Sequence, residues 1–358
     1  MTTTDITPAL LVIPEDKSIA SGMGGPADLV LEGGGVKGIG LAGVILALDE
    51  AGYEFRRVAG TSAGAVVATI VAALNAKGQP LSRLRDFMEG IDYSEFTHKS
   101  RLRAALGKVG DAERLLLHMG LYDGDYLIDW LGGVLRDIGV TYFADLKTAD
   151  DKADKKWTAA QRYSLVVHVA DITRGRVVRL PWEYHEYGLE PDHQRIVDAV
   201  RASMSIPFFF EPIRFRAPAT NGYEAGWVTW VDGGLLDNFP VDVFDRTDGA
   251  PARWPTIGVK LSARLTSLNA PKSPDNVFEE AQACLTTLLD NANRYYIDDE
   301  KAARTIFVDN AGIKATDFDL SSGQQATLLR NGLAAGRTWV EDRRQQAAAA
   351  GATALQGS

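Results

Sequence analysis

The sequence predicts an α/β fold with a central, mostly parallel sheet flanked by helices. Short apolar runs at residues 28–32 and 57–60 each lead into glycines, as buried strands often do. Residues 40–51 and 62–75 then place apolar side chains at helical spacing. Strand, glycine loop, helix, strand, sharp turn and helix in this order are typical of a parallel α/β sheet.

Similar patterns continue toward the end of the chain. Five further strands are expected, at residues 163–171, 176–180, 227–231, 256–260 and 305–308. Three further helices are expected, at residues 196–205, 273–291 and 322–350. The stretch 81–136 is mostly helical by pattern, so we expect it to form an insertion or a cap over the sheet.

Composition excludes several classes of protein. The chain has 358 residues, 46% of them hydrophobic, which is ample for a large core. A formal net charge of −9 argues against a nucleic-acid-binding protein, which would carry a basic surface. No window reaches the roughly 18 apolar residues of a membrane span, and no Sec-type signal is visible. Together with a single cysteine, Cys284, this predicts a cytoplasmic protein, with peripheral membrane contact left open.

A G-x-S-x-G sequence at residues 60–64 joins a predicted strand to a predicted helix, the context of a nucleophile elbow. Gly60 and Gly64 flank Ser62 because such a tight turn leaves no room for larger side chains. The turn would expose the serine hydroxyl at a helix N-terminus, where backbone amides favour developing negative charge. A flexible turn with a serine helix cap would use the same residues, so this motif alone leaves catalysis open.

A glycine-rich loop at residues 33–38 follows the first strand and matches the dinucleotide fingerprint G-x-G-x-x-G. A dinucleotide site also needs an acidic residue about 20 residues on, at the end of the second strand, where this chain has Ser62. The loop therefore suits an oxyanion hole better, because consecutive glycines let backbone amides converge on a carbonyl oxygen. The expected donors are the amides of Gly34, Gly35, Val36, Lys37 and Gly38. The Lys37 side chain either supports the loop by its charge or points into solvent.

An aspartate supplies the candidate base. Asp232 follows the predicted strand 227–231 and precedes Gly233 and Gly234, which places a carboxylate at the carboxyl edge of the sheet. An ordinary turn aspartate is the alternative. Three glycine-supported strand ends in one chain favour a dyad, in which Asp232 accepts the proton of Ser62.

The histidines do not complete a triad in the order serine, acid, histidine. None follows His193, so Asp232 cannot be the acid in that order. His185 and His193 lie in a polar stretch without strand-end glycines and would need an earlier acid such as Asp171. His168 lies inside a predicted strand, where a core or edge position is expected.

Taken together, these blocks resemble the patatin-like phospholipase family. The likeness spans roughly residues 28–242 and includes Asn238 and Pro240 after the aspartate block, and the stretch ASMSIPFF at residues 202–209. It implies a three-layer sandwich, with Ser62 as nucleophile, Asp232 as general base and the backbone of residues 34–38 as oxyanion hole. The glycines that support these motifs are Gly33, Gly60, Gly64, Gly233 and Gly234.

The resemblance also implies a function. The expected activity is hydrolysis of lipid acyl esters, of phospholipase A or lysophospholipase type, through an acyl-enzyme and without metal or other cofactor. Alternatives are a soluble esterase or neutral-lipid lipase on the same dyad, and a non-catalytic or nucleotide-binding module. An acyl chain needs an apolar slot, for which the candidate wall residues are Trp130, Phe208, Phe209, Phe210 and the run 115–119.

The expected organisation has three parts. A leader occupies residues 1–27, and the catalytic domain occupies residues 28–312, with the helical insertion at about 81–136. A C-terminal helix and flexible tail occupy residues 313–358.

Overall fold

The computed structural model describes residues 24–97, 119–122, 124–148, 162–220, 222–247, 252–261, 299–315 and 317–356. Eight of its strands form one sheet: β1 (Gly25–Leu31), β2 (Tyr53–Thr61), β4 (Leu165–Asp171), β5 (Arg176–Leu180), β7 (Ile213–Ala217), β8 (Gly226–Asp232), β9 (Thr256–Lys260) and β10 (Thr305–Phe307). Two short strands, β3 (Gly120–Tyr122) and β6 (Phe208–Phe210), pair in parallel as a separate ribbon.

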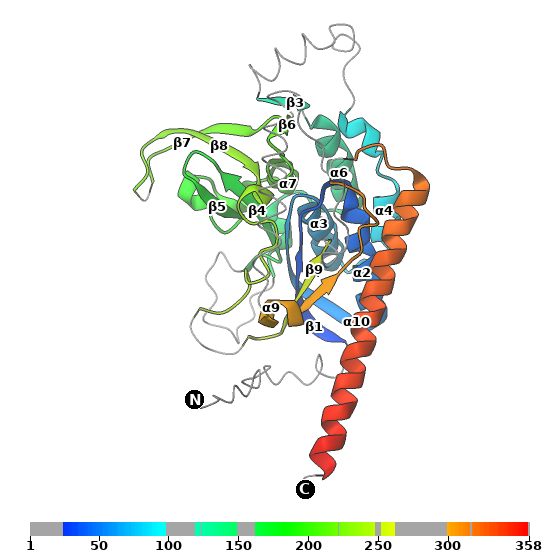
Figure 1. The fold of residues 1–358 in the computed structure, drawn as a ribbon. Helices are drawn as coiled ribbons and strands as arrows, with labels where there is room; N and C mark the ends of the chain where they lie inside the picture. The colour runs from blue at the N-terminus through cyan, green and yellow to red at the C-terminus, as the bar shows by residue number, and fades with distance from the viewer. Residues whose placement is uncertain are drawn as a thin grey trace, which may run out of the picture.

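The main sheet runs in the order β10-β9-β1-β2-β4-β8-β7, and β5 pairs with β4 as well (Figure 1). Strands β10, β9, β1, β2 and β4 are parallel, whereas β5 and β8 are antiparallel to β4 and β7 is antiparallel to β8. Every residue of β4 is buried, as expected of a strand covered on both faces. The predicted class, a mostly parallel sheet with flanking helices, is confirmed.

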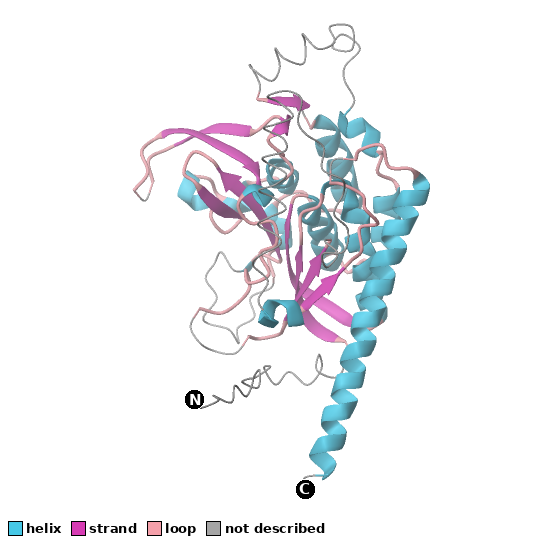
Figure 2. Ribbon diagram, in the orientation of Figure 1, coloured by secondary structure: helices cyan, strands magenta, loops and turns pink. Residues whose placement is uncertain are grey.

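Helices cover one face of this sheet (Figure 2). They are α2 (Gly38–Glu50), α3 (Ala63–Ala76), α4 (Arg83–Glu89), α6 (Asp125–Ile138), α7 (Ile196–Ser203) and α10 (Ser322–Gln356). The short helix α9 (Asp299–Ala303) precedes β10 and lies apart from this layer (Figure 1). Helices α2, α3 and α7 contact the strands, α4 and α6 pack outside them, and α10 lies along α2. On the other face, Phe244 closes a small apolar cluster over Val30, Ala59 and Val166.

Some sequence predictions need correction. The insertion at 81–136 contains the strand β3 as well as helices α4 and α6. Residues 208–210 form the strand β6 instead of packing as a group behind α7, and Phe208 is 36% exposed. Local pattern could not show this, because β6 exists only through its pairing with β3. The predicted helix 273–291, Cys284 and most of the run 115–119 lie outside the described residues.

The contact between α2 and α10 depends on small residues. Helix α10 continues to Gln356, past the end that the sequence predicts, and buries Leu328 and Leu329. A β-carbon on Gly332 would lie 2.0 Å from the Gly40 carbonyl oxygen of α2. A β-carbon on Gly43 of α2 would lie 2.4 Å from the Leu329 carbonyl oxygen of α10, so the two backbones approach this closely because Gly332 and Gly43 have no side chain. This explains why α2 is apolar nearly all round, since it lies between the sheet and α10.

We expect Gly332→Ala to destabilise the protein, although alanine favours helix. The added methyl group would clash with backbone, and such overpacking costs about 1–3 kcal/mol of unfolding free energy. Gly323→Ala is the matched control on the same helix, because its β-carbon would meet only Ser321 Oγ, at 3.9 Å. Denaturant unfolding of both variants measures the difference. Equal stabilities for the two variants would contradict the proposed packing.

Candidate active site

Strand register brings the three predicted motifs to one edge of the sheet. Leu31 at the end of β1 pairs with Gly60 of β2, directly before the glycine loop and the serine. Thr61 pairs with His168 of β4, and the next residue of β4, Val169, pairs with Asp232 of β8. The carboxyl ends of β1, β2 and β8 therefore lie at nearly the same level of the sheet. Ser62, Asp232 and the loop 33–38, which follow or end these strands, face the same space.

The backbone at Ser62 is strained. Ser62 lies between β2 and α3 with φ 53° and ψ −125°, a conformation that residues with a side chain rarely adopt. A β-carbon at Gly60 would lie 2.3 Å from the Gly64 carbonyl oxygen. One at Gly64 would lie 2.4 Å from the Leu31 carbonyl oxygen of β1. The two glycines are therefore required by close backbone approach, and the serine is held at the first turn of α3.

A second serine fixes this turn from behind. The Ser62 amide donates to Ser203 Oγ at 2.8 Å, and the Ser203 hydroxyl donates to the His168 carbonyl at 2.6 Å. Ser203 is fully buried at the end of α7 and thus links the elbow to β4. The sequence contained this residue in the ASMSIPFF stretch but gave no sign of its role, which depends on the packing of α7 against the sheet.

The aspartate is buried beside the serine. Asp232 is 5% exposed and Ser62 is 4% exposed, and Ser62 lies close enough to favour the charged form of the Asp232 carboxyl. The Gly234 amide donates to Asp232 Oδ1 at 2.8 Å. Burial raises the pKa of Asp232 to about 7, and Ser62 and the Gly234 amide only partly oppose that rise. A carboxyl group with this pKa can accept and release a proton near neutral pH.

A methionine covers the other side of the serine. Met204 Sδ lies 3.5 Å from Ser62 Oγ, and the Met204 side chain is 7% exposed. It also lines a narrow, mainly apolar hollow, together with Phe96, Gly124, Leu127, Arg201 and Phe210. Of the expected slot residues, Phe210 reaches this hollow, whereas Trp130 packs partly buried against the core. The hollow and the nucleophile therefore share one wall.

Three of the five loop amides that were expected to bind an oxyanion already donate hydrogen bonds to carbonyls of the protein. The Val36 amide donates to the Ala315 carbonyl at 3.1 Å and the Lys37 amide to the Gly34 carbonyl at 3.2 Å. The Gly38 amide donates to the Gly35 carbonyl. Within the described residues, the structure gives no acceptor for the Gly34 and Gly35 amides. The Lys37 side chain is partly buried.

Asn238 ties the glycine loop to the aspartate loop. The Asn238 side-chain Nδ2 donates to the Gly33 carbonyl at 3.0 Å, and the backbone carbonyl of Asn238 accepts from the Gly33 amide at 3.0 Å. A β-carbon at Gly33 or Gly234 would lie 2.1 Å or 2.6 Å from Asn238 Oδ1. The asparagine therefore fits between two glycines and fixes the spacing of the two loops.

A buried ion pair anchors the start of the glycine loop. Glu32 bonds Lys260 Nζ through Oε1, and its Oε2 accepts from the Leu261 amide at 2.5 Å. Glu32 and Lys260 are 2% and 3% exposed. The pair joins the ends of β1 and β9 directly before Gly33. No local pattern indicates this pair, because 228 positions separate the partners in the sequence.

The described histidines are not placed as catalytic bases. His168 is a buried core residue, as predicted, and burial together with the nearby Arg179 lowers its pKa to about 3. His185 and His193 are exposed. Asp171 accepts hydrogen bonds from the Thr173 amide at 2.9 Å and the Tyr187 hydroxyl at 2.8 Å, so it structures a turn. No hydrogen bond joins any of these three histidines to Ser62.

Comparison with known proteins gives the family. A family model for patatin-like phospholipase matches residues 29–245, which is more than half of the chain. The chain belongs to this family. YqhO of Bacillus subtilis (strain 168), an uncharacterized protein, is 34% identical over 305 residues, or 85% of this chain and 94% of YqhO. The uncharacterized NTE family protein Rv2565 of Mycobacterium tuberculosis (strain ATCC 25618 / H37Rv) is 30% identical over 223 residues, or 62% of this chain and 28% of Rv2565.

Solved structures of two bacterial proteins are also similar to this patatin-like chain. VipD from Legionella pneumophila has a TM-score of 0.48 at 17% identity, covering 88% of this chain and 67% of VipD. ExoU from Pseudomonas aeruginosa, solved in complex with SpcU, has a TM-score of 0.44 at 16% identity, covering 89% of this chain and 53% of ExoU. None of the helices among the described residues is both long and apolar enough to span a membrane.

We expect Asp232→Asn to stabilise the folded protein at alkaline pH. Because the pKa of Asp232 is raised in the folded state, its contribution to stability is greatest at low pH and is lost as the pH rises through about 7. Asparagine keeps the acceptor for the Gly234 amide without a buried charge. The variant should gain about 1–3 kcal/mol more unfolding free energy over wild type at pH 8.5 than at pH 5, where the folded-state carboxyl is still mostly protonated. Denaturant unfolding at both pH values measures this, and a gain of equal size at both would contradict the raised pKa.

Proposed function

We propose that this protein hydrolyses carboxylic esters of lipids, with Ser62 as nucleophile and Asp232 as general base. The observation that carries the proposal is the buried pair of these two side chains at the carboxyl edge of the sheet. Members of the patatin-like phospholipase family are lipid hydrolases, and the family match spans both residues. Phospholipids and lysophospholipids are the expected substrates.

The proposed reaction has two steps. Ser62 Oγ attacks the ester carbonyl while Asp232 takes the hydroxyl proton, and the carbonyl oxygen becomes an oxyanion. The C–O bond then breaks, the leaving alcohol takes the proton from Asp232, and an acyl-serine remains. Water then attacks the acyl-serine carbonyl while Asp232 takes one of its protons. The bond between the acyl carbon and Ser62 Oγ breaks, Oγ takes that proton from Asp232, and the fatty acid leaves, which restores both Ser62 and Asp232.

The Gly34 and Gly35 amides are the proposed oxyanion donors. They are the two loop amides without an acceptor among the described residues, and they follow Gly33, which Asn238 fixes in place. The amides of Val36, Lys37 and Gly38 are already engaged, so the five donors expected from the sequence reduce to two. Fixed donors stabilise the transition state without reorganising during the reaction.

The hollow beside Met204 is the proposed entrance to the acyl site. Its wall includes the aromatic and aliphatic side chains of Phe96, Leu127 and Phe210 as well as Arg201, and Met204 both lines it and contacts the Ser62 hydroxyl. Methionine has a flexible unbranched side chain that changes rotamer easily. An acyl chain that displaces Met204 would lie against Leu127 and Phe210 while its carbonyl meets Ser62.

The experiment that tests the proposed dyad is labelling with a fluorophosphonate probe, which reacts with activated serines. Wild type should label at a rate that rises with pH through about 7, since the base must be unprotonated. Ser62→Ala should not label, and Asp232→Asn should label at least about 100-fold more slowly. Ser82→Ala is the control, because Ser82 is exposed and makes no cap hydrogen bond. Labelling of Ser62→Ala above a few per cent of wild type would rule out the dyad.

We expect Met204→Ala to change acyl-chain preference. Removing the side chain between the hollow and Ser62 opens space for longer acyl groups. The ratio of kcat/KM for a long-chain ester to that for a short-chain ester should rise about 10-fold. Met88→Leu is the control, because Met88 is buried in α4 and does not line the hollow. The ratio does not depend on the folded fraction, and an unchanged ratio in Met204→Ala would place the acyl site elsewhere.

A further inference from the structure

The β7–β8 hairpin extends beyond the edge of the sheet that carries the active site. Strand β8 is antiparallel to β4 and ends at Asp232, so its first residues lie past the carboxyl ends of β1 and β2. Gly226 at the start of β8 pairs with Ala217 at the end of β7. Figure 1 shows the hairpin projecting away from the helical layer. Any surface that meets this tip therefore lies on the same side of the molecule as Ser62.

On the outer face of this hairpin, the indole of Trp227 lies beside the guanidinium groups of Arg214 and Arg216. Trp227 is 54% exposed, the highest value among the exposed large apolar side chains of the described residues. Arg216 pairs with Trp227 across the strands, and Arg214 lies on the same face. Both guanidinium carbons lie 5.5 Å from the Trp227 ring centre. Neither arginine forms an ion pair with a carboxylate of the described residues, so both retain donors for an external anion.

Other exposed apolar side chains lie in segments that are joined to the hairpin or follow the strands beside it. Seven large ones are exposed in the described part of the chain, and Tyr142 is one of them. The other six lie in the hairpin, in the turns that follow β4 and β8, or at the β3–β6 ribbon that leads into β7: Met119, Ile172, Phe208, Tyr223, Trp227 and Leu236.

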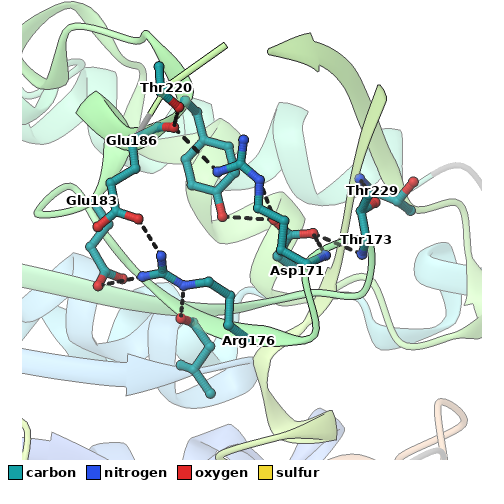
Figure 3. Close-up of polar contacts among 10 residues, drawn as sticks. Asp171, Thr173, Arg176, Glu183, Glu186, Thr220 and Thr229 are labelled. Carbon is teal, nitrogen blue, oxygen red and sulfur yellow. Dashed lines mark hydrogen bonds and ion pairs between the residues drawn. The ribbon is translucent and has the colours of Figure 1, made fainter. Parts of the chain in front are cut away.

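The inner face of the hairpin is rigidly held. Trp230 packs edge-on against Phe215 and Tyr187, with ring centres 4.7 Å and 4.9 Å apart. Polar contacts fix its two strands (Figure 3): the Thr229 amide donates to Thr173 Oγ1 at 2.9 Å, and the Thr220 hydroxyl donates to the Glu186 carbonyl. The outer face is therefore presented in a fixed shape, which lowers the entropy cost of binding.

We propose that the outer face of the β7–β8 hairpin docks on lipid bilayers that contain anionic phospholipids. Tryptophan favours the headgroup level of a bilayer, because its ring is apolar and its N–H needs a partner. Arginine binds phosphate through two parallel hydrogen bonds while its flat face stacks on an aromatic ring. The proposal rests on the proposed function, since docking here would bring lipid esters to the edge where Ser62 lies.

The local positive charge of the hairpin determines which lipids it should bind. Residues 213–226 carry Arg214, Arg216 and one acidic residue, Glu224, in a chain whose net charge is −9. An acidic protein is repelled by an anionic membrane unless a local basic group faces it, and each arginine near the surface contributes about 1 kcal/mol. Binding should therefore require anionic lipid, depend on both arginines and weaken with added salt.

The test is co-flotation of the full chain with vesicles of phosphatidylcholine, with and without phosphatidylglycerol. Ser62→Ala is the parent protein, so that hydrolysis cannot alter the vesicles. The parent should float only with the phosphatidylglycerol vesicles. Introducing either Trp227→Ala or the pair Arg214→Gln and Arg216→Gln into this parent should lower its partition coefficient between vesicles and buffer about 10-fold or more. These side chains are exposed, and melting curves identify variants that fold as the parent does.

Two matched controls show whether lost binding comes from this face of the hairpin or from removing any exposed aromatic or basic side chain. Tyr142→Ala removes another exposed aromatic residue, outside the β7–β8 hairpin, and Arg56→Gln with Arg337→Gln removes two exposed arginines elsewhere. Both should float as the parent does. Failure of the parent to float, equal binding to neutral vesicles, or equal losses in controls and hairpin variants would each overturn the proposal. Turnover of a monomeric soluble ester by wild type tests the proposed dyad separately, because it requires no membrane.

Discussion

Ser62 holds a φ of 53°, and the surrounding packing keeps it there. Gly60 and Gly64 allow the first turn of α3 to lie against the backbone of β1, and Ser203 binds the Ser62 amide from the opposite side. This single tight turn determines how close the ends of β1 and β2 come to α3. The glycine loop then follows from the end of β1, so its position depends on the same contact.

The site combines features that oppose stability with features that hold it together. Burial of Asp232 raises its pKa and makes its charged form costly, yet a base with a pKa near 7 suits proton transfer better than an exposed aspartate. The loops around it are fixed by Asn238 and by the buried Glu32–Lys260 pair. These contacts hold the loops while the aspartate and the serine occupy unfavourable environments.

Strand β8 connects the chemistry to the outer surface. Its last residue is Asp232, and its second residue is Trp227 on the exposed face of the hairpin. Trp230, between them, anchors the strand against Tyr187. The short strand β8 thus carries both the proposed base and the proposed lipid contact. The position of one relative to the other is fixed by alternation along the strand, since Asp232 and Trp227 point to opposite faces.

The sequence by itself determined the family and the parallel strands and proposed Ser62 and Asp232 as candidate site residues, because each depends on local pattern: apolar runs, glycines at tight turns and motif order. It did not reveal the strand β6, the links through Ser203 and Asn238, or the Glu32–Lys260 pair, because their partners lie far away in the chain. Of the five loop amides that it predicted as donors, those of Val36, Lys37 and Gly38 already bond to carbonyls of the described residues. Only the tertiary structure decides which backbone groups are already bonded and which side chains stay exposed, since both depend on what packs against them.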